Sequence, residues 1–188
     1  MTMHDIETGV KQYRAAKIQD FDPTKRELVV KAVPYGVTAD IGGGITETFA
    51  PGAFKRAAKA VDRLKVWNNH HGPMVGNAVE AEDRPDGFWI RARISRSQAG
   101  QEMLGDIEDG ILTDPSIEFR PMKDYMKVTR TADGFDVVHT RAHLVGFAMV
   151  AEGAYAGSAY VESVRDARRE RAAEEARAWF LEWQTRRV

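Results

Sequence analysis

The sequence predicts a mixed α+β domain whose sheet is mostly antiparallel and closed into a barrel. The 188 residues contain roughly seven or more short runs with the alternating or β-branched pattern of strands. Turns that contain glycine or proline separate several of these runs, as in hairpins. Helical patterns do not alternate regularly with the strand patterns, which favours an α+β domain over a parallel sheet built from βαβ units.

The first predicted strand is at residues 28–33, which are rich in β-branched side chains and stop at a proline. A second, shorter strand is predicted at residues 46–49. Pro51 suits the first turn of a helix, which the alanine-rich residues 53–60 continue. Residues 64–67 alternate like a strand and end at two asparagines and two histidines.

The middle of the chain predicts a hairpin followed by a helix. Residues 75–81 and 87–94 flank the turn at residues 84–87, in which proline presets φ and glycine accepts a positive φ. In residues 98–111 apolar side chains recur at helical spacing and predict a core-facing stripe. The stripe consists of Ala99, Met103, Leu104, Ile107 and Ile111.

Strands follow in the next part of the chain. They are predicted at residues 116–122 and 125–129, with a tight turn at 132–134. Residues 135–150 form one long extended run with an almost wholly apolar centre, which is typical of a buried strand. Residues 165–187 are dense in Arg, Glu and Ala and lack Pro and Gly, so they predict a C-terminal helix.

The predicted C-terminal helix divides the chain into two parts, a barrel domain at residues 1–160 and a helix within 161–188. The helix either packs on its own barrel or on a second copy, or it is a handle for another assembly protein. Soluble monomers rarely expose a large apolar face, so we expect a homo-oligomer. The apolar face consists of Ala172, Ala176, Trp179, Phe180 and Trp183.

Composition excludes several classes of partner and chemistry. The net charge is -1 with both signs interspersed, so we expect no nucleic-acid partner. The absence of cysteine excludes disulfides, thiolate nucleophiles and Cys-ligated zinc. No apolar run is long enough to cross a bilayer, and the charged residues 1–20 do not resemble a signal peptide. We therefore expect no membrane partner.

Two separated segments suggest nucleophilic catalysis. His70 follows one predicted strand, and Ser116 begins another. A serine hydroxyl is a poor nucleophile until a neighbouring imidazole takes its proton, so acyl transfer requires a Ser and a His from distant parts of the chain to meet. Alone, each residue is more often a surface or structural residue, so the surrounding motifs must decide.

Those motifs, taken in order, resemble the tailed-phage prohead (capsid maturation) proteases. The resemblance covers roughly residues 28–160, and the ordered set is more specific than any single motif. The motifs are A-x-x-Y-G at 32–36, ETFAPGAF at 47–54, Asn69-His70 followed by Gly76, SIEF at 116–119, and AHLVGFAMV at 142–150 followed by Ala154-Tyr155.

The resemblance implies a serine endopeptidase with a fold similar to herpesvirus assemblin, a β-barrel wrapped by helices. Ser116 would be the nucleophile and His70 the general base, and no cofactor is required. The implied substrates are the scaffold, the major capsid protein and the protease itself. The implied location is the procapsid in the host cytoplasm. The alternative is a catalytically silent capsid-assembly or scaffold-binding protein that keeps the barrel.

The third catalytic residue is not evident from the motifs. The family usually has an acidic residue at the position of Gly146, where it would orient the imidazole. Substitutes are His143, His139 and Glu152, of which we favour His143. Strand alternation nevertheless places residue 143 on the opposite face from 146. His71 is a reserve candidate for the base.

Histidine content raises the alternative of a metal site, since four of the five histidines are His70, His71, His139 and His143. On a helix, residues 139 and 143 would be neighbours. On a strand, four residues span about 13 Å, too far for both to bind one metal ion. The local pattern is that of a strand, so we expect no metal.

Overall fold

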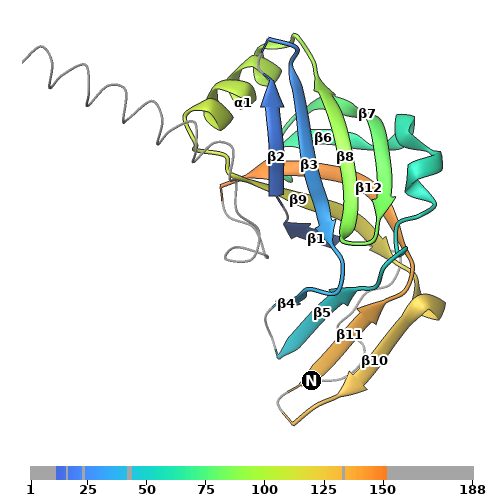
Figure 1. Cartoon of the computed structure of the whole chain (residues 1–188). Helices are drawn as coiled ribbons and strands as arrows, with labels where there is room; N and C mark the ends of the chain where they lie inside the picture. Colours follow the sequence, from blue (N-terminus) through green and yellow to red (C-terminus); the bar gives the residue numbers. More distant parts are fainter. Residues whose placement is uncertain (1–11, 16, 23, 42–43, 133, 152–188) are drawn as a thin grey trace, which may run out of the picture.

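The computed structural model describes residues 12–15, 17–22, 24–41, 44–132 and 134–151, arranged in two sheets (Figure 1). The larger sheet has eight strands in the order β1-β9-β12-β6-β7-β8-β3-β2, and the smaller has four in the order β10-β11-β5-β4. The strands are β1 (Gln12–Ala15), β2 (Lys17–Asp22), β3 (Glu27–Pro34), β4 (Thr38–Asp40), β5 (Ile45–Phe49), β6 (Lys65–Asn68), β7 (Met74–Arg84), β8 (Gly87–Ile94), β9 (Asp114–Pro121), β10 (Met126–Arg130), β11 (Phe135–His139) and β12 (Ala142–Val150).

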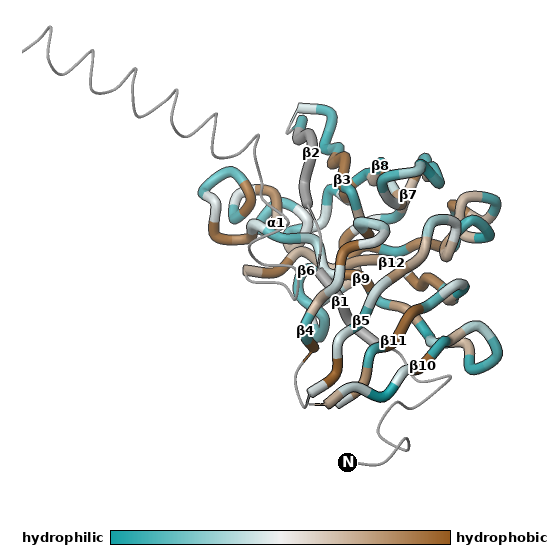
Figure 2. Tube along the Cα trace, turned by 60° about the horizontal axis from the view of Figure 1, so that its bottom comes forward, coloured by the Kyte–Doolittle hydropathy of each residue, from teal (hydrophilic) through white to brown (hydrophobic). Residues whose placement is uncertain are grey.

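The larger sheet curls into a half-barrel around the hydrophobic core (Figure 1). Its neighbouring strands are antiparallel except β12 and β6, and the only parallel pair of the smaller sheet is β11 and β5. Figure 2 shows hydrophobic stretches along strands and hydrophilic ones at several loops. The prediction of a strand-rich, mostly antiparallel domain is confirmed, but the larger sheet is a half-barrel with β1 and β2 at its ends rather than the closed barrel that the sequence predicts. Within the described residues there is one α-helix, so helices that wrap a barrel are not seen there.

Helix α1 (Gln98–Glu108) confirms the predicted helix, but it ends three residues early. Its N-terminus is capped by the Ser97 hydroxyl, which accepts a hydrogen bond from the Gly100 N–H at 3.2 Å. At the other end Gly110 has a φ of +67°, and the N–H of Ile111 donates to the Asp106 carbonyl. This is a Schellman motif, which stops the helix. Ile111 is therefore exposed and does not belong to the core stripe.

The helix predicted at residues 53–60 is wrong. The chain forms turns and two short 3₁₀ helices, η2 (Ala57–Lys59) and η3 (Val61–Arg63). In an α-helix the Ala53 carbonyl would accept from residue 57, whereas here it accepts from the Ala142 N–H of β12 at 3.1 Å. The turns bury Ala53 and Phe54 in the core, so tertiary contacts decide the local structure.

The extended run predicted at residues 135–150 is two strands, β11 and β12, which belong to different sheets. Three strands were not predicted: β1, β2 and β4. The short 3₁₀ helix η4 (Lys123–Tyr125) precedes β10. No helix in the described ranges is long and apolar enough to cross a membrane. The predicted C-terminal helix and the boundary at residue 160 lie outside the described residues and stay predictions.

Candidate active site

Strand β9 positions two polar side chains on one face of the larger sheet. Ser116 and Glu118 are two residues apart, and alternate residues of a strand point to the same side. Both are buried, with 4% and 0% of their surface exposed. Isoleucine and phenylalanine at the intervening positions, Ile117 and Phe119, are fully buried. Ile117 and Phe119 pack on one face of β9 and thereby fix the register of the strand. The same register places Ser116 and Glu118 on the opposite face.

His70 reaches this face from a short loop after β6. Asn69 has a φ of +61°, a left-handed conformation that asparagine tolerates better than most residues. Its N–H donates to the Met149 carbonyl of β12 at 3.0 Å, which ties the loop to the sheet. A Cβ atom on Gly72 would overlap the Asn68 carbonyl, so the tight turn requires glycine. This loop directs the His70 side chain back over β12.

Strand β12 lies between β6 and β9, and the residues of β12 that pair with Ser116 and Glu118 are small. Ala148 is the partner of Ser116, and Gly146 is the partner of Glu118. On the other side of β12, Trp67 of β6 packs against Gly146. A Cβ atom built on Gly146 would lie 2.7 Å from Cζ3 of the Trp67 indole. Gly146 is therefore enclosed between Glu118 of β9 and Trp67 of β6.

The three polar side chains form a Ser–His–Glu arrangement. Nε2 of His70 lies 2.7 Å from Oγ of Ser116, and Nδ1 lies 3.4 Å from Oε1 of Glu118. The second distance is longer than an ordinary hydrogen bond, and catalytic hydrogen bonds are often long before a substrate binds. A proton on Nδ1 facing the carboxylate leaves Nε2 free to accept the hydroxyl proton. The arrangement can therefore activate the serine for attack on a carbonyl.

Substitution of Gly146 is expected to destabilise the protein because β6 approaches it closely. A Cβ atom there would lie less than 3.0 Å from two backbone atoms of Lys65, so the strands must separate. We expect Gly146→Ala to lower the free energy of unfolding by about 1–3 kcal/mol. The control is Gly105→Ala on α1, where a Cβ atom meets nothing within 4 Å, and which is expected to raise stability by about 0.5–1 kcal/mol. Urea denaturation measures both, and changes of the same sign would contradict the prediction.

The structure brings together two of the three residues singled out in the sequence. His70 and Ser116 are in hydrogen-bond contact, while the reserve candidate His71 is exposed to solvent. His143 is exposed as well and pairs across the sheet with Arg120, four residues from Ser116. No hydrogen bond or ion pair within the described part of the chain joins His143 to His70. The structure thus does not bring His143 to the pair.

The expectation that residues 143 and 146 lie on opposite faces is wrong. The register of β12 against β9 shifts between Leu144 and Gly146, and such a bulge interrupts strict alternation. His143 is therefore opposite Arg120 and Gly146 opposite Glu118, which are on one face. Distance along the strand, rather than the choice of face, separates His143 from Ser116.

The other two substitutes lie elsewhere. His139 is fully buried, and its Nε2 is 2.9 Å from Oε1 of Glu47. Its ring stacks on Phe49 at a centroid distance of 5.0 Å, so it packs where the smaller sheet meets the core. Glu152 is outside the described residues. Among the described residues, no group of three or more His, Asp or Glu side chains could hold a metal ion.

Glu118 is the residue of the site that sequence reasoning missed. It is the third residue of the SIEF motif at 116–119, two residues after the nucleophile candidate. Its relation to Gly146 is visible only in the structure, where the two are directly paired between β9 and β12. The carboxylate that is absent at position 146 is thus present on the facing residue of the neighbouring strand.

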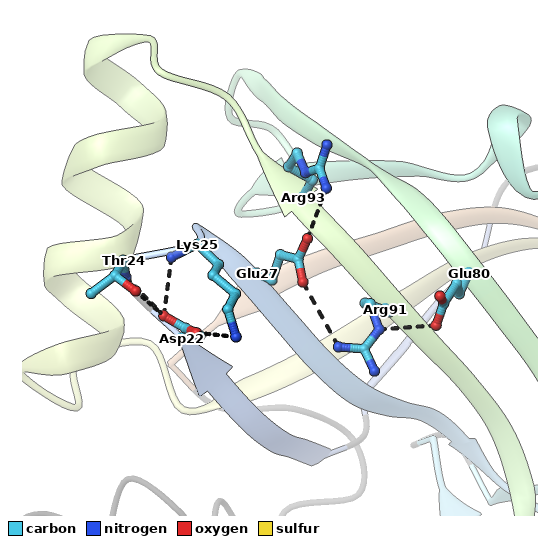
Figure 3. A network of polar contacts seen from close by, with 7 residues as sticks. All are labelled: Asp22, Thr24, Lys25, Glu27, Glu80, Arg91 and Arg93. Carbon is cyan, nitrogen blue, oxygen red and sulfur yellow. Dashed lines mark hydrogen bonds and ion pairs between the residues drawn. The ribbon is translucent and has the colours of Figure 1, made fainter.

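A second polar feature lies at the end of β2, in the turn that follows, and on β3, β7 and β8 (Figure 3). There Arg93 donates to Glu27 and Arg91 donates to Glu80, each at 2.9 Å. The Thr24 hydroxyl and the Lys25 N–H hold the pKa of the Asp22 carboxyl well below its usual range. An adjacent cavity of about 680 Å³ has no residue of the Ser–His–Glu arrangement in its lining.

Comparisons with known proteins agree with the motifs. The sequence matches the family described as caudovirus prohead serine protease over residues 19–172. The fold is similar to that of the bacteriophage T4 capsid assembly protease, gp21, with a TM-score of 0.50 and 10% sequence identity, over 74% of this chain and 98% of that chain. A search of curated proteins gave no match. The family match confirms the resemblance read from the sequence.

Proposed function

Because the chain belongs to the caudovirus prohead serine protease family, we propose that it is the endopeptidase that cleaves scaffold and major capsid protein inside the procapsid, in the host cytoplasm. Ser116 is the nucleophile and His70 the general base. The observation that carries this proposal is the 2.7 Å contact between Oγ of Ser116 and Nε2 of His70. The likeness to the T4 capsid assembly protease supports the same fold.

Glu118, rather than His143, orients the base in this proposal. Its carboxylate faces Nδ1 of His70 at 3.4 Å and keeps the proton on that nitrogen. It also stabilises the imidazolium that forms when Nε2 takes the serine proton. Since Glu118 is completely buried, water screens this interaction little, and its electrostatic effect is stronger than at a surface.

The reaction proceeds in two halves. As Oγ of Ser116 bonds to the peptide carbonyl carbon, its proton passes to Nε2 of His70. The same nitrogen then gives the proton to the departing amine, the C–N bond breaks, and an acyl-enzyme ester remains on Ser116. Water, deprotonated by Nε2, attacks the ester, and the proton returns to Oγ as the acid is released.

The test is a time course of intact mass for the purified chain, alone and with the scaffold and capsid proteins of its own phage. We expect new fragments with the wild-type chain and none with Ser116→Ala. A fluorophosphonate probe should add to the wild-type chain at Ser116 alone. Intact scaffold together with persistent binding would instead favour the catalytically silent assembly protein.

A further inference from the structure

Strand β1 lies along the free side of the strand that carries the nucleophile. In the larger sheet β1 is the terminal strand and pairs with β9 alone. The pairing is antiparallel and covers the candidate site, with Tyr13 opposite Glu118 and Ala15 opposite Ser116. The edge of β9 beside the Ser–His–Glu arrangement is therefore occupied by the chain's own N-terminal segment.

Strand β1 runs in the direction expected for the residues of a substrate that precede the cleaved peptide bond, which form its acyl side. The chain runs from Gln12, opposite Phe119, towards Ala15, opposite Ser116. An extended peptide in the same track would bring its next peptide bond to the nucleophile, with the residues before that bond hydrogen-bonded to β9. Proteins commonly bind extended peptides by adding them as a strand to a sheet edge. The β9 edge thus has the position and the polarity that peptide cleavage requires.

Two further observations indicate that β1 is separable from the rest of the sheet. The family match begins at residue 19, so β1 lies before the matched residues. Strands β2 and β3 also approach β9, so the curl of the sheet does not depend on β1 alone.

We propose that the β9 edge from Ser116 to Phe119 is the track for the acyl side of the substrate, and that β1 occupies it in the resting protease. The substrate is an extended segment of a polypeptide, and it binds as an antiparallel strand after β1 leaves. This inference rests on the proposed function, since it assigns a peptide to the same site. The N-terminal segment is then an intramolecular competitor of the substrate. The apparent affinity for the substrate equals the intrinsic affinity multiplied by the fraction of molecules in which β1 has left the track.

The test is a reversible disulfide between β1 and β9 in the full chain. Arg14 and Ile117 are Cα partners, and Cα atoms paired in antiparallel strands are about 4.5–5.5 Å apart, within the range that a disulfide spans. Because the chain has no cysteine, Arg14→Cys/Ile117→Cys can form only this bond within one molecule. The control is Glu80→Cys/Arg91→Cys, another paired position, on β7 and β8.

We expect oxidation of the β1–β9 variant to lower kcat/KM for a scaffold peptide by about tenfold or more, with recovery on reduction, because the competitor can no longer leave. The control variant should cleave equally in both states. Equal cleavage by the oxidised and reduced β1–β9 variant would overturn the inference while leaving the protease function intact. A wild-type chain that neither cleaves nor reacts with a fluorophosphonate would instead refute the function itself.

A second pair of variants keeps the core unchanged, in case cysteine at position 117 prevents folding. Alternate residues of an edge strand direct their N–H groups to the neighbouring strand, so either Tyr13 or Arg14 donates to β9. Proline at the donating position removes that bond and weakens β1. We expect one of Tyr13→Pro and Arg14→Pro to raise kcat/KM for the peptide, and the other to change it less. No increase in either variant would contradict the inference.

Discussion

Replacement of Ser116 or His70 by alanine is expected to lower kcat for peptide cleavage by about 10⁴-fold or more. The two side chains act as a unit, since Oγ of Ser116 is nucleophilic only when Nε2 of His70, 2.7 Å away, takes its proton. The double variant should therefore be no worse than either single variant. Cleavage of a scaffold peptide under single-turnover conditions measures the effect, and circular dichroism verifies that each variant is folded.

His71→Ala is the matched control for the base, because this neighbouring histidine is exposed. It should retain cleavage at nearly the wild-type rate. An inactive His71→Ala variant beside an active His70→Ala variant would place the base one residue later. Cleavage by a folded Ser116→Ala variant at the wild-type rate would end the serine-protease proposal.

Glu118→Gln is expected to lower kcat by about 10³–10⁴-fold, as removal of the orienting carboxylate does in a Ser–His–Asp triad. The amide has nearly the shape of the carboxylate but would present an N–H to Nδ1 of His70. The imidazole proton would then move to Nε2, which could no longer accept the proton of Ser116. The same peptide assay measures the loss, and thermal unfolding verifies that the buried substitution is tolerated.

Two comparisons separate this role from a general effect of charge. Glu80→Gln removes an exposed carboxylate on β7 and should leave kcat unchanged. His143→Ala tests the other candidate for the third residue. We expect it to keep its activity, because His143 lies four residues along the sheet from the level of Ser116. Full activity of Glu118→Gln together with loss in His143→Ala would reverse the assignment.

The parts of the fold that sequence could predict are those governed by local signals. The hairpin of β7 and β8 follows from its Pro-Asp-Gly turn, and α1 follows from the spacing of its apolar residues. The split of residues 135–150 between two sheets could not be read, because a strand pattern does not specify which sheet the strand joins. The turns around Ala53 were also hidden, since a hydrogen bond from Ala142 replaces the helical one.

The candidate site also contains residues that the sequence could identify and one that it could not. Ser116 and His70 stand in recognisable motifs, so the sequence alone could single them out. Glu118 could not be singled out by type, because its importance depends on the register that sets it opposite Gly146. The argument from strand alternation also failed at this point, since the bulge before Gly146 shifts the faces of β12. The site could therefore not be predicted in full from the sequence, because the sequence does not show the bulge in β12.

The placement of Ser116 and Glu118 two residues apart on one strand has a consequence for how the site forms during folding. A slip of β9 by one residue would turn both side chains to the other face together, leaving the imidazole without either partner. Mispaired chains would therefore be wholly inactive rather than partly active. Once β9 is paired correctly, formation of the site requires one further step, in which the loop that carries His70 packs against β12. In the protease proposed above, such an all-or-none arrangement would limit cleavage by incompletely folded copies.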